Sequence, residues 1–141
     1  MEVITEHIEV ATKGESEVVD ITRQVAALIA QSRMKEGNVT VFVSGSTASV
    51  TTTEFEPGLQ RDIPEALEHL VPQGIRYHHD DTWHDGNGHS HVRAALMGPS
   101  LTVPFSGGKM LLGTWQQIVL ADHDNRPRQR GIVVQIIGTR Q

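Results

Sequence analysis

Short runs rich in β-branched residues recur along this chain and restrict its fold more than any other feature. Each run is bounded by glycine, proline or polar turn residues, which is typical of strands in antiparallel sheets. The link Ser106-Gly107-Gly108 has the composition of a hairpin turn. The pattern predicts strands over residues 2–11, 39–43, 48–55, 100–105, 109–122 and 130–138.

Two stretches instead carry apolar residues at helical spacing. The first predicts a helix over residues 20–36, with Asp20 as N-cap and Gly37 as C-terminal cap. The second covers residues 59–71, and its regular part is expected to begin just before Pro64, because proline is best tolerated in the first turn of a helix.

The order of these elements is not the regular strand–helix–strand alternation of a parallel sheet. It favours an α+β fold with a largely antiparallel, β-sandwich-like core and two main helices. No linker or low-complexity segment interrupts the 141 residues, so residues 1–141 are expected to form a single domain.

Composition excludes several classes of function. Without cysteine, the chain has no disulfide, no thiolate metal ligand and no cysteine nucleophile. A formal net charge of −5 argues against a nucleic-acid partner. No apolar run approaches the ~20 residues that cross a bilayer, and the acidic N-terminal segment lacks the features of a signal peptide. We therefore expect no membrane contact and a cytoplasmic location.

Residues 78–91, the histidine segment, hold the strongest functional signal. They read HHDDTWHDGNGHSH and contain five of the eight histidines together with three aspartates. Imidazole and carboxylate groups bind divalent metals and move protons near neutral pH. The alternative is a solvated turn, in which Asp, Asn, Gly and His are common. His84 and Asp85 are the weakest candidates and are expected to be turn residues.

Spacing within this segment suggests particular metal ligands. His89 and His91 are two residues apart, so on an extended backbone they face the same side, and a loop can return His79 to the same point. Three imidazoles and a water form an open zinc site, whereas adding Asp81 or a phosphate oxygen suits manganese, cobalt or nickel. Asn87, between two glycines, is expected to donate to a ligand or to shape the turn.

Other residues are candidates for anion binding or acid–base chemistry. Ser46 lies in the hydroxyl-rich turn 45–49, which forms either a small anion nest or an ordinary turn. Glu54 follows a β-branched run and is a candidate general base or metal ligand, although a single glutamate at a strand end is usually solvated.

Three arginines near the C-terminus alternate with other residues. Arg126, Arg128 and Arg130 share one face of an extended segment and carry donors suited to phosphate. Alternatively, they pair with the neighbouring Asp122 and Asp124.

Residues 87–130 resemble the signature region of the YjbQ-type family of small proteins. The most specific part is residues 100–117, where Ser-Leu-Thr-Val-Pro, a glycine turn and Leu-Gly-Thr-Trp-Gln follow in order. The resemblance covers nearly the whole chain. It implies a compact α+β protein with a sandwich-like core that forms a homotrimer with sites near subunit boundaries. It also implies a secondary thiamine-phosphate synthase, which joins a pyrimidine pyrophosphate to a thiazole phosphate.

The resemblance carries over to individual positions. His79, Asn87, His91, Gln116 and Glu54 match positions of the family pattern. Such a reaction needs a divalent ion, zinc, magnesium or manganese, and donors around the phosphates. Together with the spacing arguments, this gives His79, His89 and His91 as metal ligands, Glu54, Asp81 and Asn87 as catalytic residues, and Ser46, Gln116 and Arg126 as binding residues for a phosphorylated small molecule.

The chain departs from the family pattern at two positions. Gly45 stands where many relatives carry a histidine, and Thr53 stands where they carry an asparagine. His89 is then a candidate to replace the missing imidazole. Three functions fit these residues: a thiamine-phosphate-synthase-like transferase, a non-catalytic binder of a phosphorylated metabolite, or a metal-dependent hydrolase.

Overall fold

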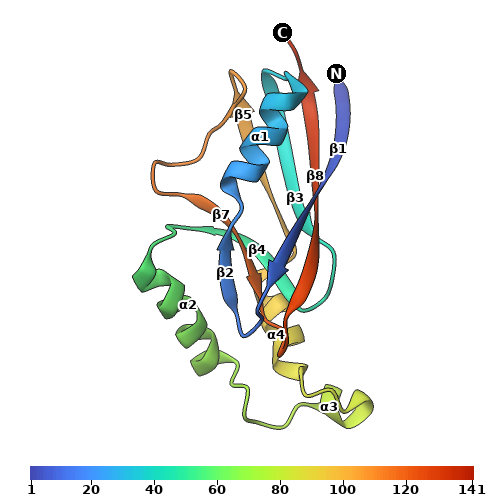
Figure 1. Cartoon of the computed structure of the whole chain (residues 1–141), viewed down its shortest axis with the longest axis vertical. Helices are drawn as coiled ribbons and strands as arrows, with labels where there is room; N and C mark the ends of the chain where they lie inside the picture. Colours follow the sequence, from blue (N-terminus) through green and yellow to red (C-terminus); the bar gives the residue numbers. More distant parts are fainter.

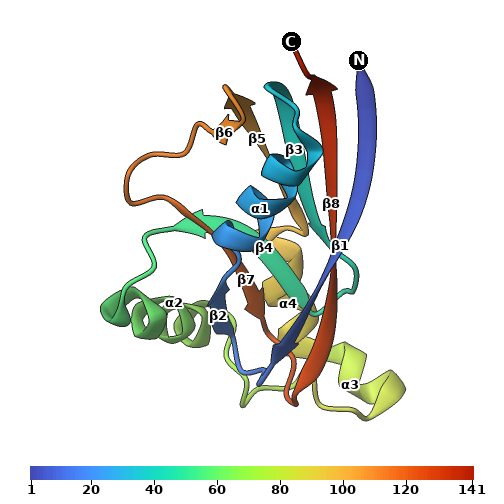
Figure 2. The same ribbon diagram turned by 45° about the horizontal axis from the view of Figure 1, so that its top comes forward.

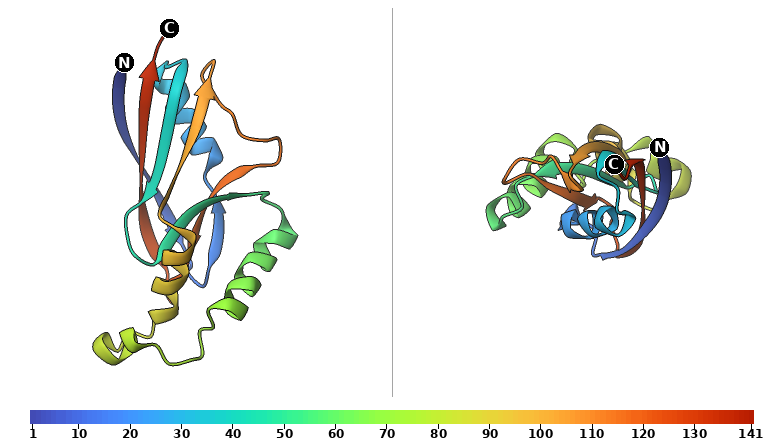
Figure 3. Two further views of the ribbon diagram at one scale, coloured as in Figure 1. Left: turned by 180° about the vertical axis from the view of Figure 1, so that it is seen from behind. Right: turned by 90° about the horizontal axis from the view of Figure 1, so that it is seen from above.

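The computed structural model describes residues 1–141 and contains eight strands and four helices (Figure 1). Both termini lie at one end of the molecule, and the two short helices of the histidine segment lie at the opposite end (Figures 1 and 3). The elements are β1 (Glu2–Thr12), β2 (Glu17–Asp20), α1 (Thr22–Ser32), β3 (Glu36–Val43), β4 (Ala48–Thr53), α2 (Pro57–Leu70), α3 (His78–Trp83), α4 (Gly88–Met97), β5 (Ser100–Ser106), β6 (Lys109–Met110), β7 (Gln117–Asp122) and β8 (Arg128–Thr139).

The strands form two antiparallel sheets. One has five strands in the order β1-β8-β3-β5-β6, and the other has three in the order β2-β7-β4. β1 and β8 pair along their whole length, from Glu2 opposite Gly138 to Thr12 opposite Arg128. The α+β fold with a largely antiparallel core is therefore confirmed.

The core lies where α1 covers the sheets. Val25 and Ile29 of α1 are buried in a cluster of 17 apolar residues to which strands of both sheets contribute. The residues are mostly valine and isoleucine, which pack well on a pleated surface. Burial of each such side chain contributes roughly 1.5–3 kcal/mol, so this cluster is the main source of stability.

The first predicted helix ends earlier than expected. α1 covers Thr22–Ser32, and Arg33 ends it in the left-handed conformation with φ 61°. Gly37 is therefore not a helix cap. It lies in β3 opposite Gly138, where a Cβ would come within 2.0 Å of the Ile137 carbonyl oxygen. Its role is to permit close approach of two backbones.

The second helix begins earlier than expected. α2 starts at Pro57 because the carboxylate of Glu56 caps it, accepting hydrogen bonds from the amides of Gly58 (2.8 Å) and Leu59 (2.6 Å). Pro64 therefore lies inside the helix. α2 lies beside β2 on the outside of the smaller sheet (Figure 2).

Residues 109–122 are not one strand. β6 covers only two residues, and β7 begins at Gln117 after an irregular segment. The predicted hairpin is confirmed, since Phe105 of β5 pairs with Met110 of β6 across two glycines with positive φ. β2 and α3 have no counterpart among the predicted elements, and residues 91–98, whose pattern fits either a strand end or a short helix, lie mostly in α4. No helix of the structure is both long and apolar enough to cross a membrane.

Candidate functional site

The histidine segment forms α3, a turn and α4, and a glycine sets how closely these helices approach. A Cβ at Gly88, the first residue of α4, would lie only 2.4 Å from Cβ of Tyr77, which precedes α3. This contact brings His79 of α3 over His91 of α4. Their ring centroids are 4.3 Å apart and their planes are inclined by 51°.

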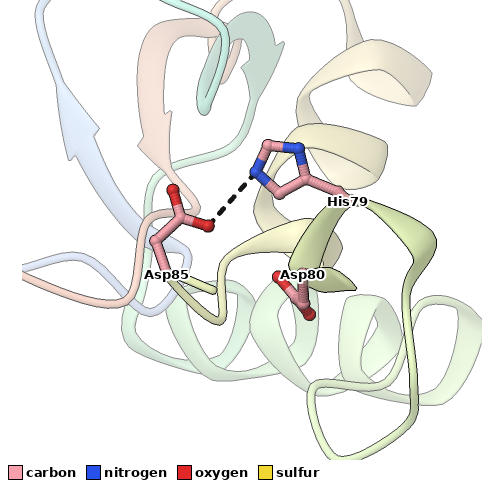
Figure 4. A group of neighbouring side chains, drawn as sticks. All are labelled: His79, Asp80 and Asp85. Carbon is pink, nitrogen blue, oxygen red and sulfur yellow. Dashed lines mark ion pairs between the residues drawn. The ribbon is translucent and has the colours of Figure 1, made fainter. Parts of the chain in front are cut away.

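Two carboxylates accompany His79. Its Nε2 lies 3.3 Å from Oδ1 of Asp85, and the two side chains face each other in Figure 4. Asp80 lies below them in that view, with its Oδ1 accepting a hydrogen bond from the Gly88 amide at 3.1 Å. One ligand atom from each of His79, Asp80 and Asp85 falls within 4.8 Å of the others. Imidazole and carboxylate at this spacing are donors that bind divalent metals.

The Asn87 side chain lies against this cluster. Its Oδ1 lies 3.0 Å from Nε2 of His79 and also faces the carboxylate of Asp85. Rotation of the amide by half a turn would let its nitrogen donate to Asp85 Oδ1 at 2.9 Å. In that orientation the amide nitrogen also lies 3.0 Å from Nε2 of His79, so Asn87 bridges the two side chains.

These side chains line one wall of a cavity of about 400 Å³. Gly45 and Ser46, from the turn between β3 and β4, contribute to another wall. We call this cavity the histidine pocket. Its charged and ligating side chains are His79, Asp85, Asn87, His91, Arg128 and Arg130.

Both arginines of the pocket are held by buried aspartates. Arg130 donates to both oxygens of Asp122, each at 2.7 Å, and Arg128 donates Nε to Asp124 at 2.9 Å. Burial acts to raise the pKa of Asp122, but hydrogen bonds from Arg130 and Thr12 outweigh it, so this pKa is lowered. The expected pairing with Asp122 and Asp124 is thus confirmed for Arg128 and Arg130, but not for the exposed Arg126. The Nη1 atoms of both arginines make none of these bonds.

The pocket as a whole is negative. Asp85 lines it, Asp80 lies next to Asp85, and Asp122 and Asp124 pair with its two arginines, so these four carboxylates and two guanidinium groups leave two negative charges in excess when the imidazoles are neutral. A free anion is therefore repelled unless a cation binds first.

The expectation that His89 and His91 face the same side is wrong. Both lie on α4, and at 3.6 residues per turn two positions separated by two residues point about 200° apart. His89 is fully buried, its Nδ1 has no hydrogen-bond partner, and burial lowers its pKa. It lies outside the pocket that His91 lines.

The aspartate beside His79 is Asp80 and not the expected Asp81. The carboxylate of Asp81 is bound to the exposed Arg76 at 2.6 Å and lies outside the acceptor cluster, where Asp80 is found instead. Asp85, expected as a turn residue, reaches His79. The left-handed conformation of His84, with φ 60°, ends α3 and turns the chain back.

The predicted binding and catalytic residues do not converge within one chain. Ser46 lines the histidine pocket, but Gln116 lines another cavity and donates to Thr52 at 3.1 Å. Glu54 lines a third cavity. Arg126 is exposed and contributes to none of these cavities.

His123, between Asp122 and Asp124 in the sequence, is a buried histidine for which sequence analysis predicts no role. His123 is fully buried, and its ring nitrogens lie 2.8 Å from the hydroxyls of Ser16 and Ser49. Arg93 donates to the same Ser16 hydroxyl at 3.0 Å. Burial lowers the pKa of His123 to about 4, so this imidazole is neutral at pH 7. A single histidine after a strand carries no signal that predicts such a network.

Comparison with known proteins gives one family. Residues 6–139 match the family model described as "UPF0047 protein YjbQ-like". A UPF0047 protein of Methanothermobacter thermautotrophicus is 40% identical over 138 residues, which cover 98% of this chain and 94% of the relative. One from Methanocaldococcus jannaschii is 37% identical, covering 92% of this chain and 91% of the relative.

Solved structures agree with these sequence matches. A YbjQ-like protein of unknown function from Sulfolobus solfataricus superposes with a TM-score of 0.91 at 34% identity, covering 97% of this chain and 98% of the other. A hypothetical protein from Aeropyrum pernix has a TM-score of 0.89 at 32% identity, covering 98% and 99%.

Proposed function

Because this chain belongs to the UPF0047 YjbQ-like family, we propose that its histidine pocket binds a divalent metal ion together with the phosphate groups of a small molecule. The metal ligands of this proposal are His79, Asp85 and Asp80, with Asn87 and His91 beside them. The sequence predicts His89 and Asp81 at this site. Asp80 and Asp85 take their place, because the fold brings these two carboxylates close to His79.

The observation that carries the proposal is the convergence of acceptor atoms. One ligand atom from each of His79, Asp80 and Asp85 lies within 4.8 Å of the others, and Nε2 of His79 is 3.3 Å from Oδ1 of Asp85. A bound cation satisfies all of them at once, and it also offsets the excess negative charge of the pocket.

Phosphate binding is supported by other residues that line the histidine pocket. Ser46, Arg128 and Arg130 all line the pocket, and the Ser46 hydroxyl and the Nη1 atoms of the arginines are donors suited to phosphate oxygens. Since the pocket is negative without a cation, phosphate affinity is expected to depend on the metal. A bound divalent ion would neutralise charge on a pyrophosphate leaving group.

The first candidate activity is the thiamine-phosphate-synthase-like transfer that the family resemblance implies. The second is non-catalytic binding of a phosphorylated metabolite. One observation favours the second: Glu54 and Gln116, two residues expected to act in the reaction, line other cavities of the chain. In the homotrimer implied by the resemblance, a neighbouring subunit is a second source of these two side chains. The oligomeric state therefore bears on the choice between transferase and binding protein.

Exposed apolar side chains support the proposed trimer. Leu111 is 62% exposed and Trp115 is 71% exposed, both in the irregular segment before β7. Apolar side chains of this size are often covered by another chain. Light scattering of the protein, beside a Leu111→Glu, Trp115→Glu variant, tests this. We expect a trimer for the protein and a smaller species for the variant, and a monomeric wild-type protein would contradict the proposal.

The metal is tested by titration calorimetry with Mn²⁺ on metal-free protein. His79→Ala is expected to abolish binding, whereas His78→Ala is a matched control because the His78 side chain is 98% exposed and does not line the pocket. Pyrophosphate is then titrated with and without Mn²⁺. Binding of pyrophosphate that is equally tight without the metal, or Mn²⁺ binding that survives His79→Ala, would refute the proposed site.

The activity is tested by incubating the protein with both thiamine precursors and Mg²⁺ or Mn²⁺ and measuring thiamine phosphate. Product that disappears in His79→Ala and persists in His78→Ala supports the transferase. If no product forms although pyrophosphate with Mn²⁺ raises the melting temperature, the binding function is the correct one.

A further inference from the structure

A second cavity adjoins the histidine pocket. It measures about 270 Å³ and shares Gly45, Ser46 and His91 with the histidine pocket. The rest of its lining consists of Ala48, Ala94, Ala95 and Pro99. We call it the alanine pocket. The two cavities thus meet at the β3–β4 turn and at one face of α4.

The two cavities differ sharply in chemistry. The histidine pocket is lined by imidazoles, carboxylates and guanidinium groups, whereas beyond the three shared residues the alanine pocket is lined only by alanine and proline. An apolar cavity of roughly 150 Å³ already accommodates a benzene ring. The alanine pocket is therefore large enough for one ring or a short branched chain, and it offers that group almost no hydrogen bonds.

Gly45 keeps the two cavities connected. Its φ of +132° belongs to the region that favours glycine, and a Cβ there would lie 3.0 Å from Nη1 of Arg130. Any larger side chain at this position would occupy the boundary between the cavities. It would also crowd the guanidinium nitrogen that remains available for a phosphate.

We propose that the ligand is an amphipathic phosphorylated small molecule, with its phosphate in the histidine pocket and an apolar ring or short branched chain in the alanine pocket. This inference rests on the proposed function and adds the class of substrate. Ala95 and Gly45 determine its specificity, because larger side chains there would occupy the space of the apolar group. Ala95 is the better position to change, since it is exposed on α4 and its φ is helical.

The experiment measures the affinity of three probes by titration calorimetry in the presence of saturating Mn²⁺. The probes are inorganic phosphate, phenyl phosphate and ribose 5-phosphate. Phenyl phosphate is expected to bind about tenfold tighter than inorganic phosphate, because its ring leaves water for an apolar cavity. Ribose 5-phosphate is expected to bind no tighter than phosphate. Its hydroxyls would lose their hydrogen bonds to water, and the alanine pocket offers no partners in their place.

Variants then locate the apolar group. Ala95→Leu fills the alanine pocket and is expected to reduce phenyl phosphate affinity to that of phosphate while leaving phosphate affinity unchanged. Leu96→Phe adds the same number of carbon atoms at the neighbouring position of α4, where the side chain is 68% exposed and lines neither cavity, and should change neither affinity.

The outcomes separate this inference from the proposed function. If inorganic phosphate binds but phenyl phosphate binds no tighter, the inference is overturned while the proposed function stands. Equal gains for phenyl phosphate and ribose 5-phosphate, or an equal loss of all probes in Ala95→Leu, would also overturn it. If no probe binds to a protein that is folded by its melting curve, both the proposed function and the inference are wrong.

Discussion

Nε2 of His79 and Oδ1 of Asp85 lie 3.3 Å apart because the chain reverses between them at His84. α3 is only six residues long and ends in a left-handed residue, so Asp85 folds back over the first turn of its own helix. The pair therefore depends on local backbone geometry, and Gly88 then fixes it against α4.

Asp85→Asn is expected to weaken Mn²⁺ binding at least about tenfold, because it removes a charged ligand while keeping the shape of the side chain. Asp81→Asn is the matched control, since that carboxylate pairs with the exposed Arg76 and lies outside the cluster. Titration calorimetry of both variants measures the effect. An equal loss in the two variants would show that general negative charge, and not a specific ligand, attracts the ion.

The buried pair of Arg130 and Asp122 predicts a large effect on stability. Arg130→Met leaves the Asp122 carboxylate buried without its main partner, which typically costs 3–5 kcal/mol. Arg126→Met should change the free energy of unfolding by less than about 0.5 kcal/mol, because Arg126 is exposed and forms no ion pair. Urea unfolding of both variants at pH 7 provides the comparison, and a cost below 1 kcal/mol for Arg130→Met would contradict it.

The close approach of β3 and β8 leads us to expect different effects of substitution at Gly131 and Gly138, which both lie in β8. A Cβ at Gly138 would lie 2.2 Å from the Glu36 carbonyl oxygen, whereas one at Gly131 would meet only the flexible end of Glu9 at 3.8 Å. Gly138→Ala is therefore expected to destabilise the fold by about 1–3 kcal/mol, and Gly131→Ala by much less. Melting temperatures of the two variants, measured side by side, test this; equal values would mean that β3 can shift away without cost.

The same residues show what the sequence can and cannot predict. Strands such as 100–105 were predictable because β-branched alternation is a local property, and the antiparallel α+β class followed from their order. The geometry of the histidine segment is not predictable from spacing alone, since an extended backbone would place His89 and His91 on one side whereas helix α4 turns them apart. Asp80 and Asp81 are neighbours in sequence, and only the structure shows that Asp80 accepts from the Gly88 amide while Asp81 pairs with Arg76. Gln116 and Glu54 matched the family pattern, which says nothing about which cavity each residue lines.

The buried imidazole of His123 predicts how stability depends on pH. Its pKa is about 4 in the folded protein and about 6.5 when unfolded, because burial disfavours the charged ring. Between these values the unfolded chain binds a proton that the folded chain does not, so stability is complete above about pH 6.5 and falls as the pH decreases toward 4. The loss attributable to this group is about 3 kcal/mol at most. Burial also lowers the pKa of His89, which adds a loss of the same sign.

Urea unfolding at pH 7.5 and pH 5.0 measures this dependence. His123→Gln retains a hydrogen-bonding side chain between Ser16 and Ser49 but does not titrate, so its free energy of unfolding should change less between the two pH values than that of the wild type. His78→Gln, at an exposed position, should keep the wild-type dependence. The carboxylates of Asp122 and Asp124 do not interfere, because their pKa values are lowered in the folded state and their contribution is lost only below about pH 4. Identical pH dependence of wild type and His123→Gln would show that His123 takes up its proton without cost, and that water reaches the Ser16–His123–Ser49 network.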